Sequence, residues 1–153
     1  MKISKIGQVP IERLFATIRQ SLKDDFQQNT GSTLQDQDII QGLTYTKVFG
    51  DKGQHSVKVI IEEFSAPNCY AVCFHSNRGK EHVRYLLEDL GNAQTNIEYS
   101  YEMEADDIFV KGNYFLMEKL FSKSIKRQTE AQLEALIRHS VDGASAYYLD
   151  YIQ

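Results

Sequence analysis

Tyrosine side chains are the most suggestive chemical groups in this sequence. Nine of its 153 residues are tyrosines. A closed core normally uses Leu, Ile and Phe, because a buried phenol hydroxyl needs a hydrogen-bond partner. Several phenols around a cavity could instead hydrogen-bond one amphipathic small molecule. The alternative is a filled core in which each hydroxyl reaches the sheet edge or a backbone carbonyl. Five tyrosines stand at alternating, strand-like positions that predict a shared face: Tyr45, Tyr70, Tyr85, Tyr99 and Tyr101.

Other reactive side chains form weaker patterns. His75 and His82 could face each other across two strands and bind a metal with Glu81 or Glu88, but two imidazoles make half a site at best. The remaining histidines have no Ser or Cys nucleophile at a recognisable spacing. A pair of carboxylates acting as acid and base is a further alternative. We therefore predict no catalytic residue, no metal and no cofactor.

The two cysteines are predicted to be reduced. Cys69 and Cys73 stand four residues apart in a strand-like segment, on one face. Their Cα atoms would lie about 13 Å apart at 3.3 Å per residue. A disulfide needs a separation below about 7 Å. The thiols are therefore expected to be partly buried fillers.

Composition and charge narrow the class of protein. The length favours one domain. The net charge of −4 argues against nucleic acid as a partner, because phosphate binding needs a concentrated basic surface. We find no apolar run of about 18 residues, so no membrane span is expected. Met1–Lys5 lacks the apolar core of a signal peptide, and the cytoplasm is the expected location.

The elements that must position these side chains can be read from hydrophobic spacing. Residues 2–9 indicate a strand, and Pro10 opens a helix that stops at Asn29–Ser32. Residues 34–41 are either a short helix or a loop. Alternating apolar residues then predict antiparallel strands joined by tight turns. These strands are expected over residues 43–49, 55–64, 69–77, 80–89 and 95–104.

Helical spacing returns from about Phe109 to His139, where it predicts one long helix that crosses the sheet. The apolar stripe lapses between Lys126 and Ala131, so the last turns are expected to project or bend. The predicted domain covers residues 1–142, and residues 143–153 form an aromatic tail. The helix carries two further candidate ligand-binding residues, Tyr114 and Met117. The predicted ligand-binding set is Tyr70, Tyr85, Tyr99, Tyr101, Tyr114 and Met117.

Strand register can be predicted from the apolar pairs. With Arg78-Gly79 as a hairpin centre, Phe74 faces Val83 and Val72 faces Tyr85. The third pair is Tyr70 with Leu87. The opposite face then pairs His75 with His82 and Cys73 with Arg84, a polar mixture that suits solvent.

The order of strand, helix, antiparallel sheet and long C-terminal helix resembles the helix-grip fold of the START and Bet v 1-like superfamily. The opening Met1-Lys2-Ile3-Ser4-Lys5, followed by Val9-Pro10-Ile11-Glu12-Arg13-Leu14-Phe15, is similar to the strand-to-helix start common there. With the strands that follow, it resembles an uncharacterised bacterial family, domain of unknown function 3284, over about residues 1–138. The resemblance implies an α+β fold, a curved antiparallel sheet wrapped around a long C-terminal helix, and no established activity.

Three functions fit this picture. The favoured hypothesis is a soluble protein that binds a hydrophobic or amphipathic small molecule between the sheet and the long helix. The first alternative is an interaction or regulatory protein with a filled cavity, with a protein partner held through the C-terminal tail. The second is a hydrolase or cyclase with its site in the cavity, as the wider superfamily implies. A His or Glu that points into the cavity beside a Tyr would favour the enzyme.

Overall fold

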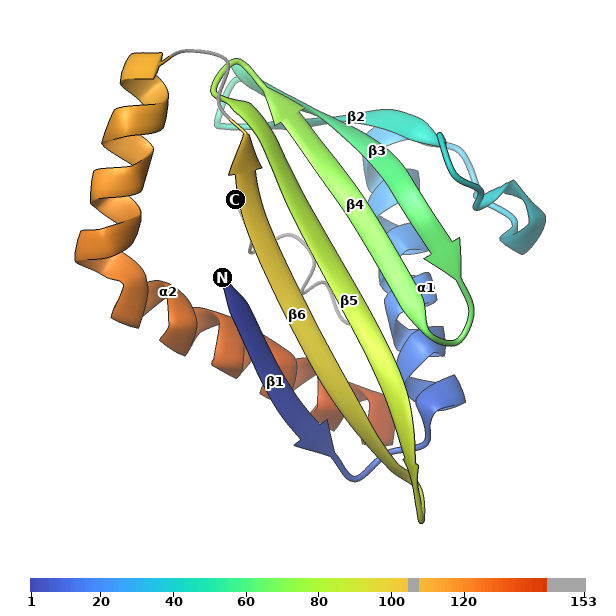
Figure 1. The fold of residues 1–153 in the computed structure, drawn as a ribbon. Helices are drawn as coiled ribbons and strands as arrows, with labels where there is room; N and C mark the ends of the chain where they lie inside the picture. Colours follow the sequence, from blue (N-terminus) through green and yellow to red (C-terminus); the bar gives the residue numbers. More distant parts are fainter. Residues whose placement is uncertain (105–107, 143–153) are drawn as a thin grey trace.

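The computed structural model describes residues 1–104 and 108–142, and within the second range it describes side chains from residue 123 onward. Each predicted strand and both predicted helices are present, with ends displaced by a few residues (Figure 1). The segment left open in the sequence holds only a short 3₁₀ helix. The elements are β1 (Lys2–Gly7), α1 (Ile11–Thr30), η1 (Asp36–Asp38), β2 (Thr44–Phe49), β3 (His55–Ser65), β4 (Cys69–Ser76), β5 (Gly79–Gly91), β6 (Gln94–Glu104) and α2 (Ile108–Asp142).

The six strands form one curved antiparallel sheet in the order β1-β6-β5-β4-β3-β2. Strands β2 to β6 follow one another through hairpins, and β1 adds to the free side of β6. Helix α1 and the last turns of α2 lie behind the sheet in the view of Figure 1, whereas the first turns of α2 stand beside its β1/β6 edge. We call the helix side the concave face and the opposite side the outer face.

Alternation along each strand sends apolar side chains to the concave face. Val59, Val72, Val83 and Ile97 are 0–1% exposed and join one hydrophobic core with both helices. A β-bulge between Ile61 and Glu63 adds one residue to β3. The bulge explains how Ile61 and Phe64, three positions apart, both belong to the concave side of the sheet.

Helix α1 has a clear beginning and end in the sequence. Pro10 occupies its N-cap with φ −63°, where a missing N–H costs nothing. Gly31 ends it in the left-handed conformation, φ 75°, and its N–H donates to the Gln27 carbonyl at 2.8 Å. Its buried stripe, which covers the concave face, is Ile11, Leu14, Phe15, Ile18 and Leu22.

Helix α2 packs through its last turns. Residues 126–128 are exposed, as the lapse in the apolar stripe predicts, and Figure 1 shows the helix bending near its middle. Of the two predicted outcomes, the helix bends and its last turns do not project, because Leu133 and Leu136 are 1% and 3% exposed and belong to the core. Gly7 permits this close approach, since a Cβ on it would lie 2.8 Å from Cγ1 of Ile137.

The predicted register of β4 and β5 is wrong by two residues. Phe74 pairs with Glu81, Val72 with Val83 and Tyr70 with Tyr85. The turn therefore centres on residues 77 and 78, and Gly79 follows it with φ 125°, a backbone conformation that favours glycine. Because side chains alternate with a period of two, this offset leaves each of them on its predicted face.

The offset changes the neighbours on the outer face. His75 pairs with Lys80 and Cys73 pairs with His82, so the predicted His75–His82 and Cys73–Arg84 pairs are wrong. Arg84 pairs instead with Ala71. Both cysteines are free and 4% exposed, which is more deeply buried than expected for this face.

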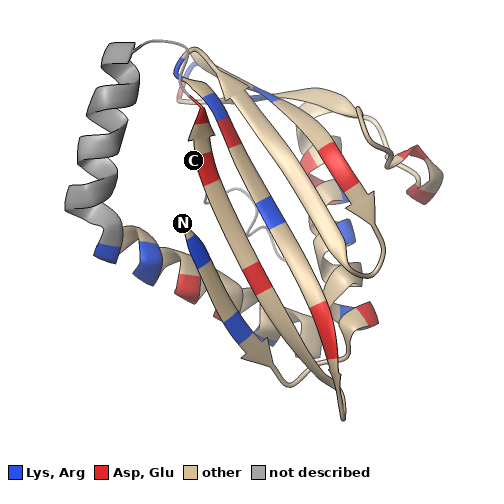
Figure 2. Ribbon diagram, in the orientation of Figure 1, with Lys and Arg blue, Asp and Glu red and all other residues tan. Residues whose placement is uncertain are grey.

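Charges of both signs are distributed along the strands, as Figure 2 shows for β1, β5 and β6. Lys2 lies 3.8 Å from Glu98, and Arg84 lies 3.6 Å from Glu63. These exposed pairs contribute little to stability. Within the described part of the chain, none of the helices has the length and apolar character needed to span a membrane.

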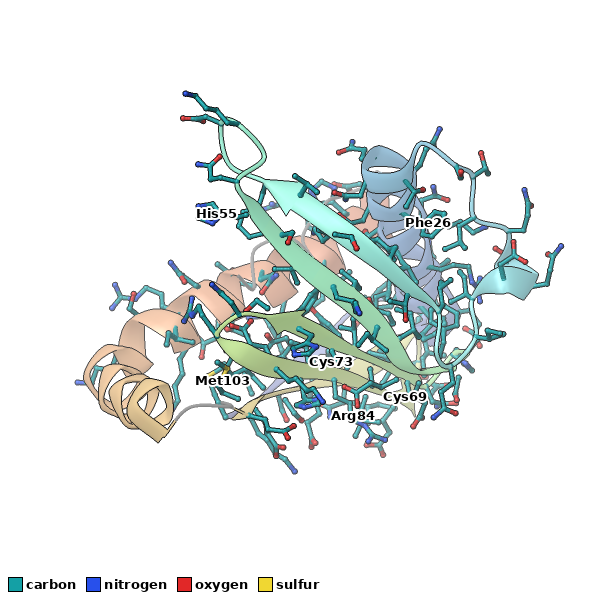
Figure 3. All side chains as sticks on the ribbon, turned by 90° about the horizontal axis from the view of Figure 1, so that it is seen from above. Phe26, His55, Cys69, Cys73, Arg84 and Met103 are labelled. Atoms are coloured by element: carbon teal, nitrogen blue, oxygen red, sulfur yellow. The ribbon has the colours of Figure 1, made fainter. Side chains whose placement is uncertain are left out.

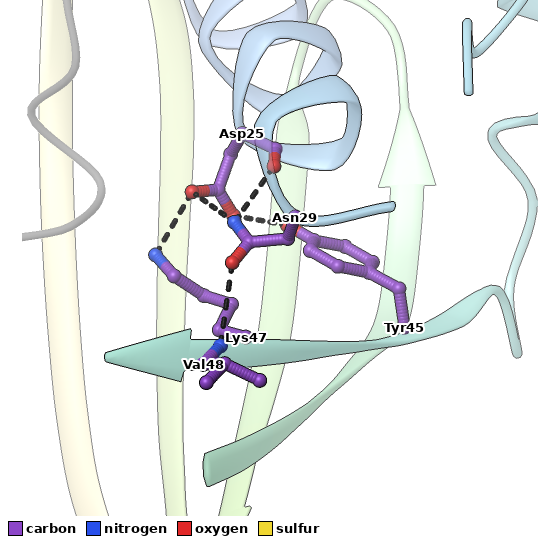
Figure 4. Close-up of polar contacts among 5 residues, drawn as sticks. All are labelled: Asp25, Asn29, Tyr45, Lys47 and Val48. Atoms are coloured by element: carbon purple, nitrogen blue, oxygen red, sulfur yellow. Dashed lines mark hydrogen bonds and ion pairs between the residues drawn. The ribbon is translucent and has the colours of Figure 1, made fainter. Parts of the chain in front are cut away.

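A buried polar cluster fastens the end of α1 to β2 (Figure 4). Asp25 is 6% exposed, and its carboxylate accepts from the Tyr45 hydroxyl at 2.5 Å and contacts Lys47 Nζ at 2.9 Å. The Asn29 amide donates to the Asp25 carbonyl at 2.8 Å and accepts from the Val48 N–H at 3.3 Å. Tyr45, one of the aligned tyrosines, therefore has a structural partner.

Removing the cation of this cluster should lower the stability of the fold, because the buried carboxylate would lose its charge partner. We expect Lys47→Ala to lower the free energy of unfolding by about 3–5 kcal/mol, because it leaves the Asp25 carboxylate buried without a cation. Lys5→Ala is the matched control, since Lys5 Nζ meets Glu134 at 2.7 Å on the surface. Its expected cost is about 0–1 kcal/mol. Urea unfolding of both variants measures the difference, and equal losses would contradict a structural role for the cluster.

Candidate ligand-binding site

A hollow of about 570 Å³ lies where the β2–β3 and β4–β5 hairpins turn at one end of the concave face. His55 stands near the tip of the β2–β3 hairpin in Figure 3, and its ring stacks on Phe49 with 5.5 Å between the centroids. The strands supply an apolar wall and the turns supply polar groups. The described residues that line the hollow are Phe49, Gln54, His55, Ser56, Val57, Phe74, Ser76, Asn77, Arg78 and Glu81.

Two opposed strand residues bound the hollow on the sheet side, and buried core residues follow them along the strands. Phe74 and Glu81 face each other across β4 and β5, and the next inward pair is Val72 with Val83. These two valines are each 1% exposed. Phe49 marks the open side, because 42% of its surface is exposed although it is a large apolar residue. A ligand here would meet an apolar wall that is already formed.

Glu81 is the unusual group of the site, a half-buried carboxyl on an apolar face. Burial raises its pKa above the ordinary value of 4.5, because a low-polarity surrounding disfavours the charged form. The positive charge of Arg78 and a hydrogen bond with Tyr101 act in the opposite direction and only partly offset the effect. A carboxyl with a raised pKa keeps its proton to a higher pH than an exposed one, a property common among functional carboxyls.

Three of the predicted ligand-binding tyrosines form a continuous aromatic row across the sheet. The row runs Phe64, Tyr70, Tyr85, Tyr99 through directly opposed strand positions. Adjacent ring centroids are 5.2–6.0 Å apart. Tyr70, Tyr85 and Tyr99 are only 1–2% exposed, and burial raises the pKa of Tyr85 well above its usual range. In this structure they are core residues that do not line the hollow, and their role in binding a ligand stays a prediction.

The other predicted site residues divide into two groups. Tyr101 is half-buried and reaches the site through its hydrogen bond with Glu81. Tyr114 and Met117 lie outside the described side chains, as does the whole tail 143–153 with its predicted protein contacts.

Sequence reasoning missed four residues that the structure brings together: Phe49, His55, Arg78 and Glu81. It placed Glu81 beside His75 and His82, yet alternation from Val83 puts Glu81 on the concave face. The sequence signal for Glu81 was a carboxylate at an alternating position that shares one strand face with Val83, Tyr85 and Leu87. The other three required the positions of the hairpin turns, which sequence spacing alone does not give.

Known structures share this fold at low sequence identity. DynU16, described as a putative protein in the dynemicin biosynthetic locus, has a TM-score of 0.58 at 10% identity over 95% of this chain. The match covers 48% of DynU16, so this chain spans about half its length. Ara h 8.0201 has a TM-score of 0.58 at 10% identity, covering 93% of this chain and 97% of that one. The Polyketide_cyc-like protein Cgl2372 from Corynebacterium glutamicum has a TM-score of 0.50 at 16% identity, covering 98% and 86%.

The curved six-stranded antiparallel sheet with its C-terminal helix is the α+β helix-grip fold expected from the sequence, and these Bet v 1-like neighbours share it. The profile of the family described as "Domain of unknown function (DUF3284)" matches residues 1–122, and the chain belongs to that family. No curated protein matches the sequence.

The raised pKa of Glu81 predicts a pH-dependent cost of folding. The folded state holds this proton more tightly than the unfolded chain, so the contribution is favourable below the ordinary value of 4.5 and is lost as pH rises through the raised pKa. Glu81→Gln mimics the protonated form. We expect it to raise the urea midpoint near neutral pH and to have little effect below about pH 4.

Glu102→Gln controls for the loss of one negative charge, because Glu102 is exposed on the outer face of β6. A Glu81→Gln variant that is less stable than the wild type near neutral pH would show that the charged carboxylate is well accommodated.

Proposed function

We propose that this protein binds a hydrophobic or amphipathic small molecule at the hairpin end of its concave face. The observation that carries the proposal is Glu81, a half-buried carboxyl in a hollow whose apolar wall is formed by Phe74, Val57 and Phe49. A few placed polar groups on an apolar wall are the usual composition of a small-molecule pocket. The volume of about 570 Å³ lies within the range of such pockets.

The positions of the groups suggest how a ligand would lie. Its apolar part would pack on Phe49 and Phe74, and its polar group would meet Glu81 and Arg78 near the turns. The buried Val72 and Val83 follow Phe74 and Glu81 along the strands and do not line the hollow, which favours a compact molecule over a long chain that runs down the sheet. Tyr70, Tyr85 and Tyr99 would remain core residues, and Tyr101 would act through its hydrogen bond with Glu81.

Relatives support the class of function at the level of fold. Proteins of the helix-grip superfamily commonly bind hydrophobic small molecules, and the neighbours include a protein from a biosynthetic locus and a polyketide cyclase-like protein. Fold alone does not establish activity. A bacterial source and a cytoplasmic location are part of the same proposal, and two free thiols are compatible with a reducing compartment.

An apolar fluorescent dye tests binding directly. We expect anilinonaphthalene sulfonate to bind the native protein with no loss of near-ultraviolet ellipticity. Phe49→Ala should weaken binding about tenfold, because the lost aromatic contact area corresponds to at least 1.4 kcal/mol. Val48→Ala is the control, since Val48 is 55% exposed on the same strand and faces the other way.

Two results would count against the pocket. One is a native protein that causes no increase in the fluorescence of the dye, and the other is an equal loss of affinity in both variants. Native mass spectrometry of protein purified from its own host then identifies any retained ligand by its mass.

A hydrolase or cyclase is the second candidate, and the position of Glu81 beside Tyr101 favours it. A carboxyl with a raised pKa can act as general acid or base, which contributes about 10²–10⁴-fold to a rate. We expect an enzyme of this kind to hydrolyse a chromogenic aryl ester faster than buffer. Glu81→Gln should then remove the acceleration while dye binding persists. Hydrolysis that is unchanged by Glu81→Gln would eliminate Glu81 as the catalytic group.

A further inference from the structure

A second cluster of reactive side chains lies on the outer face, away from the hollow. Glu62, Cys73 and His82 each direct one potential metal-ligand atom into a common space, and the three atoms lie within 4.8 Å of one another. Figure 3 shows Cys73 on the side of the sheet that points away from α1. The cluster therefore shares no residue with the proposed ligand pocket.

Three features of the sheet bring the cluster together. Cys73 and His82 are directly opposed on β4 and β5, and opposed side chains on one face are close neighbours. Glu62 comes from β3, on the other side of β4, at the bulge between Ile61 and Glu63. An extra residue in a strand re-aims its side chain. At this bulge it leaves Glu62 beside the histidine, with Oε1 2.6 Å from Nδ1 of His82.

The donor set is chemically specific. Thiolate sulfur, imidazole nitrogen and carboxylate oxygen are the three ligand types that Zn²⁺ accepts, with bonds of about 2.0–2.3 Å. Tetrahedral ligands at those distances are about 3.5 Å apart. The widest pair of the cluster, at up to 4.8 Å, needs to close in by about 1 Å, and the Glu62–His82 pair, now 2.6 Å apart, needs to open by about the same amount. One thiolate and one carboxylate also balance the charge of a divalent cation. Side-chain rotation can supply the movement, because Glu62 is 40% exposed.

Glu104 contacts the second ring nitrogen of His82. Its Oε2 lies 3.2 Å from Nε2 of His82, the ring nitrogen that faces away from Glu62. Metal-bound histidines usually donate their other N–H to a carboxylate, which fixes the tautomer and leaves the first nitrogen for the metal. Burial alone lowers the pKa of His82, but the hydrogen-bonded carboxylates of Glu62 and Glu104 outweigh it and the net shift is upward. Without a metal, a proton on Nδ1 bridges to Glu62.

We propose that Cys73, His82 and Glu62 form a Zn²⁺ site on the outer face, with His82 Nδ1 as a ligand, Glu104 as its positioning residue and a water in the fourth position. When the ion binds, the thiol of Cys73 and the Nδ1 of His82 each release a proton to solvent, and the proton on His82 Nε2 stays directed at Glu104. Three protein ligands and a water give a site that exchanges its metal more easily than a closed four-ligand site.

Cobalt substitution provides a direct test. Untagged, reduced protein is titrated with Co²⁺, and a thiolate-to-cobalt charge-transfer band should appear and saturate at one ion per chain. Zn²⁺ should abolish the band by displacement. Cys73→Ala should lose the band, and Cys69→Ala should keep it. Cys69 is the matched control because it lies on the same face of β4, beside Glu63 and Arg84. Glu104→Ala should weaken binding about 10–100-fold.

A second measurement on the wild type guards against variants that fail to fold. Zn²⁺ should slow the alkylation of Cys73 by iodoacetamide and leave the slower reaction of Cys69 unchanged, as peptide mass spectrometry can resolve. A wild-type protein that shows no charge-transfer band overturns the proposal. A band that survives in Cys73→Ala, or protection that falls equally on both cysteines, also overturns it. Any of these three results leaves a hydrogen-bonded His82–carboxylate network as the role of the cluster.

Discussion

The concave face of the sheet must be covered, and this requirement shapes the whole molecule. Alternation gives six strands one continuous apolar face, which cannot remain in water. Helix α1 covers it through a stripe centred on Phe15 and Ile18, and the last turns of α2 close it through Leu133 and Leu136. The Asp25–Lys47 ion pair then holds the end of α1 over β2. The candidate pocket lies at the hairpin end of this same covered face.

Much of this arrangement could be predicted from the residues. Period-two alternation located β2 to β6, and Pro10 and Gly31 marked the ends of α1. The register between β4 and β5 could not be predicted from the sequence. An offset of two residues keeps every side chain on the same face of the sheet, so the hydrophobic pattern fits both registers equally well. The structure selects the register that aligns Tyr70, Tyr85 and Tyr99 in one row. In the last turns of α2, Leu133 and Leu136 continue the apolar stripe in the sequence, whereas burial of Thr129 and Ser140 could not be predicted from their polar side chains.

The two candidate sites were harder to predict for separate reasons. Glu81 is a charged residue among the apolar residues that β5 directs to the concave face. Only its position beside Phe74 and Arg78 shows that the carboxyl faces a hollow. The outer cluster depends on the bulge at Glu62, which brings together side chains from three strands. A bulge leaves a trace in the sequence, because Phe64 falls out of step with Ile61. That trace indicates a fold irregularity and gives no sign of the neighbours it creates.

The close contact at Gly7 gives the two ends of the sheet different local stabilities. At that end β1 and α2 meet with no room for a side chain on Gly7, and the buried Leu133 lies on the same helix. At the other end the hairpin turns carry exposed, mostly polar residues. Regions with few buried contacts open at the lowest free energy. Backbone amide hydrogens should therefore exchange with solvent fastest around the hollow and slowest at the end of the sheet near Gly7. A small molecule could then enter and leave through fluctuations of the hairpin tips while the core stays folded.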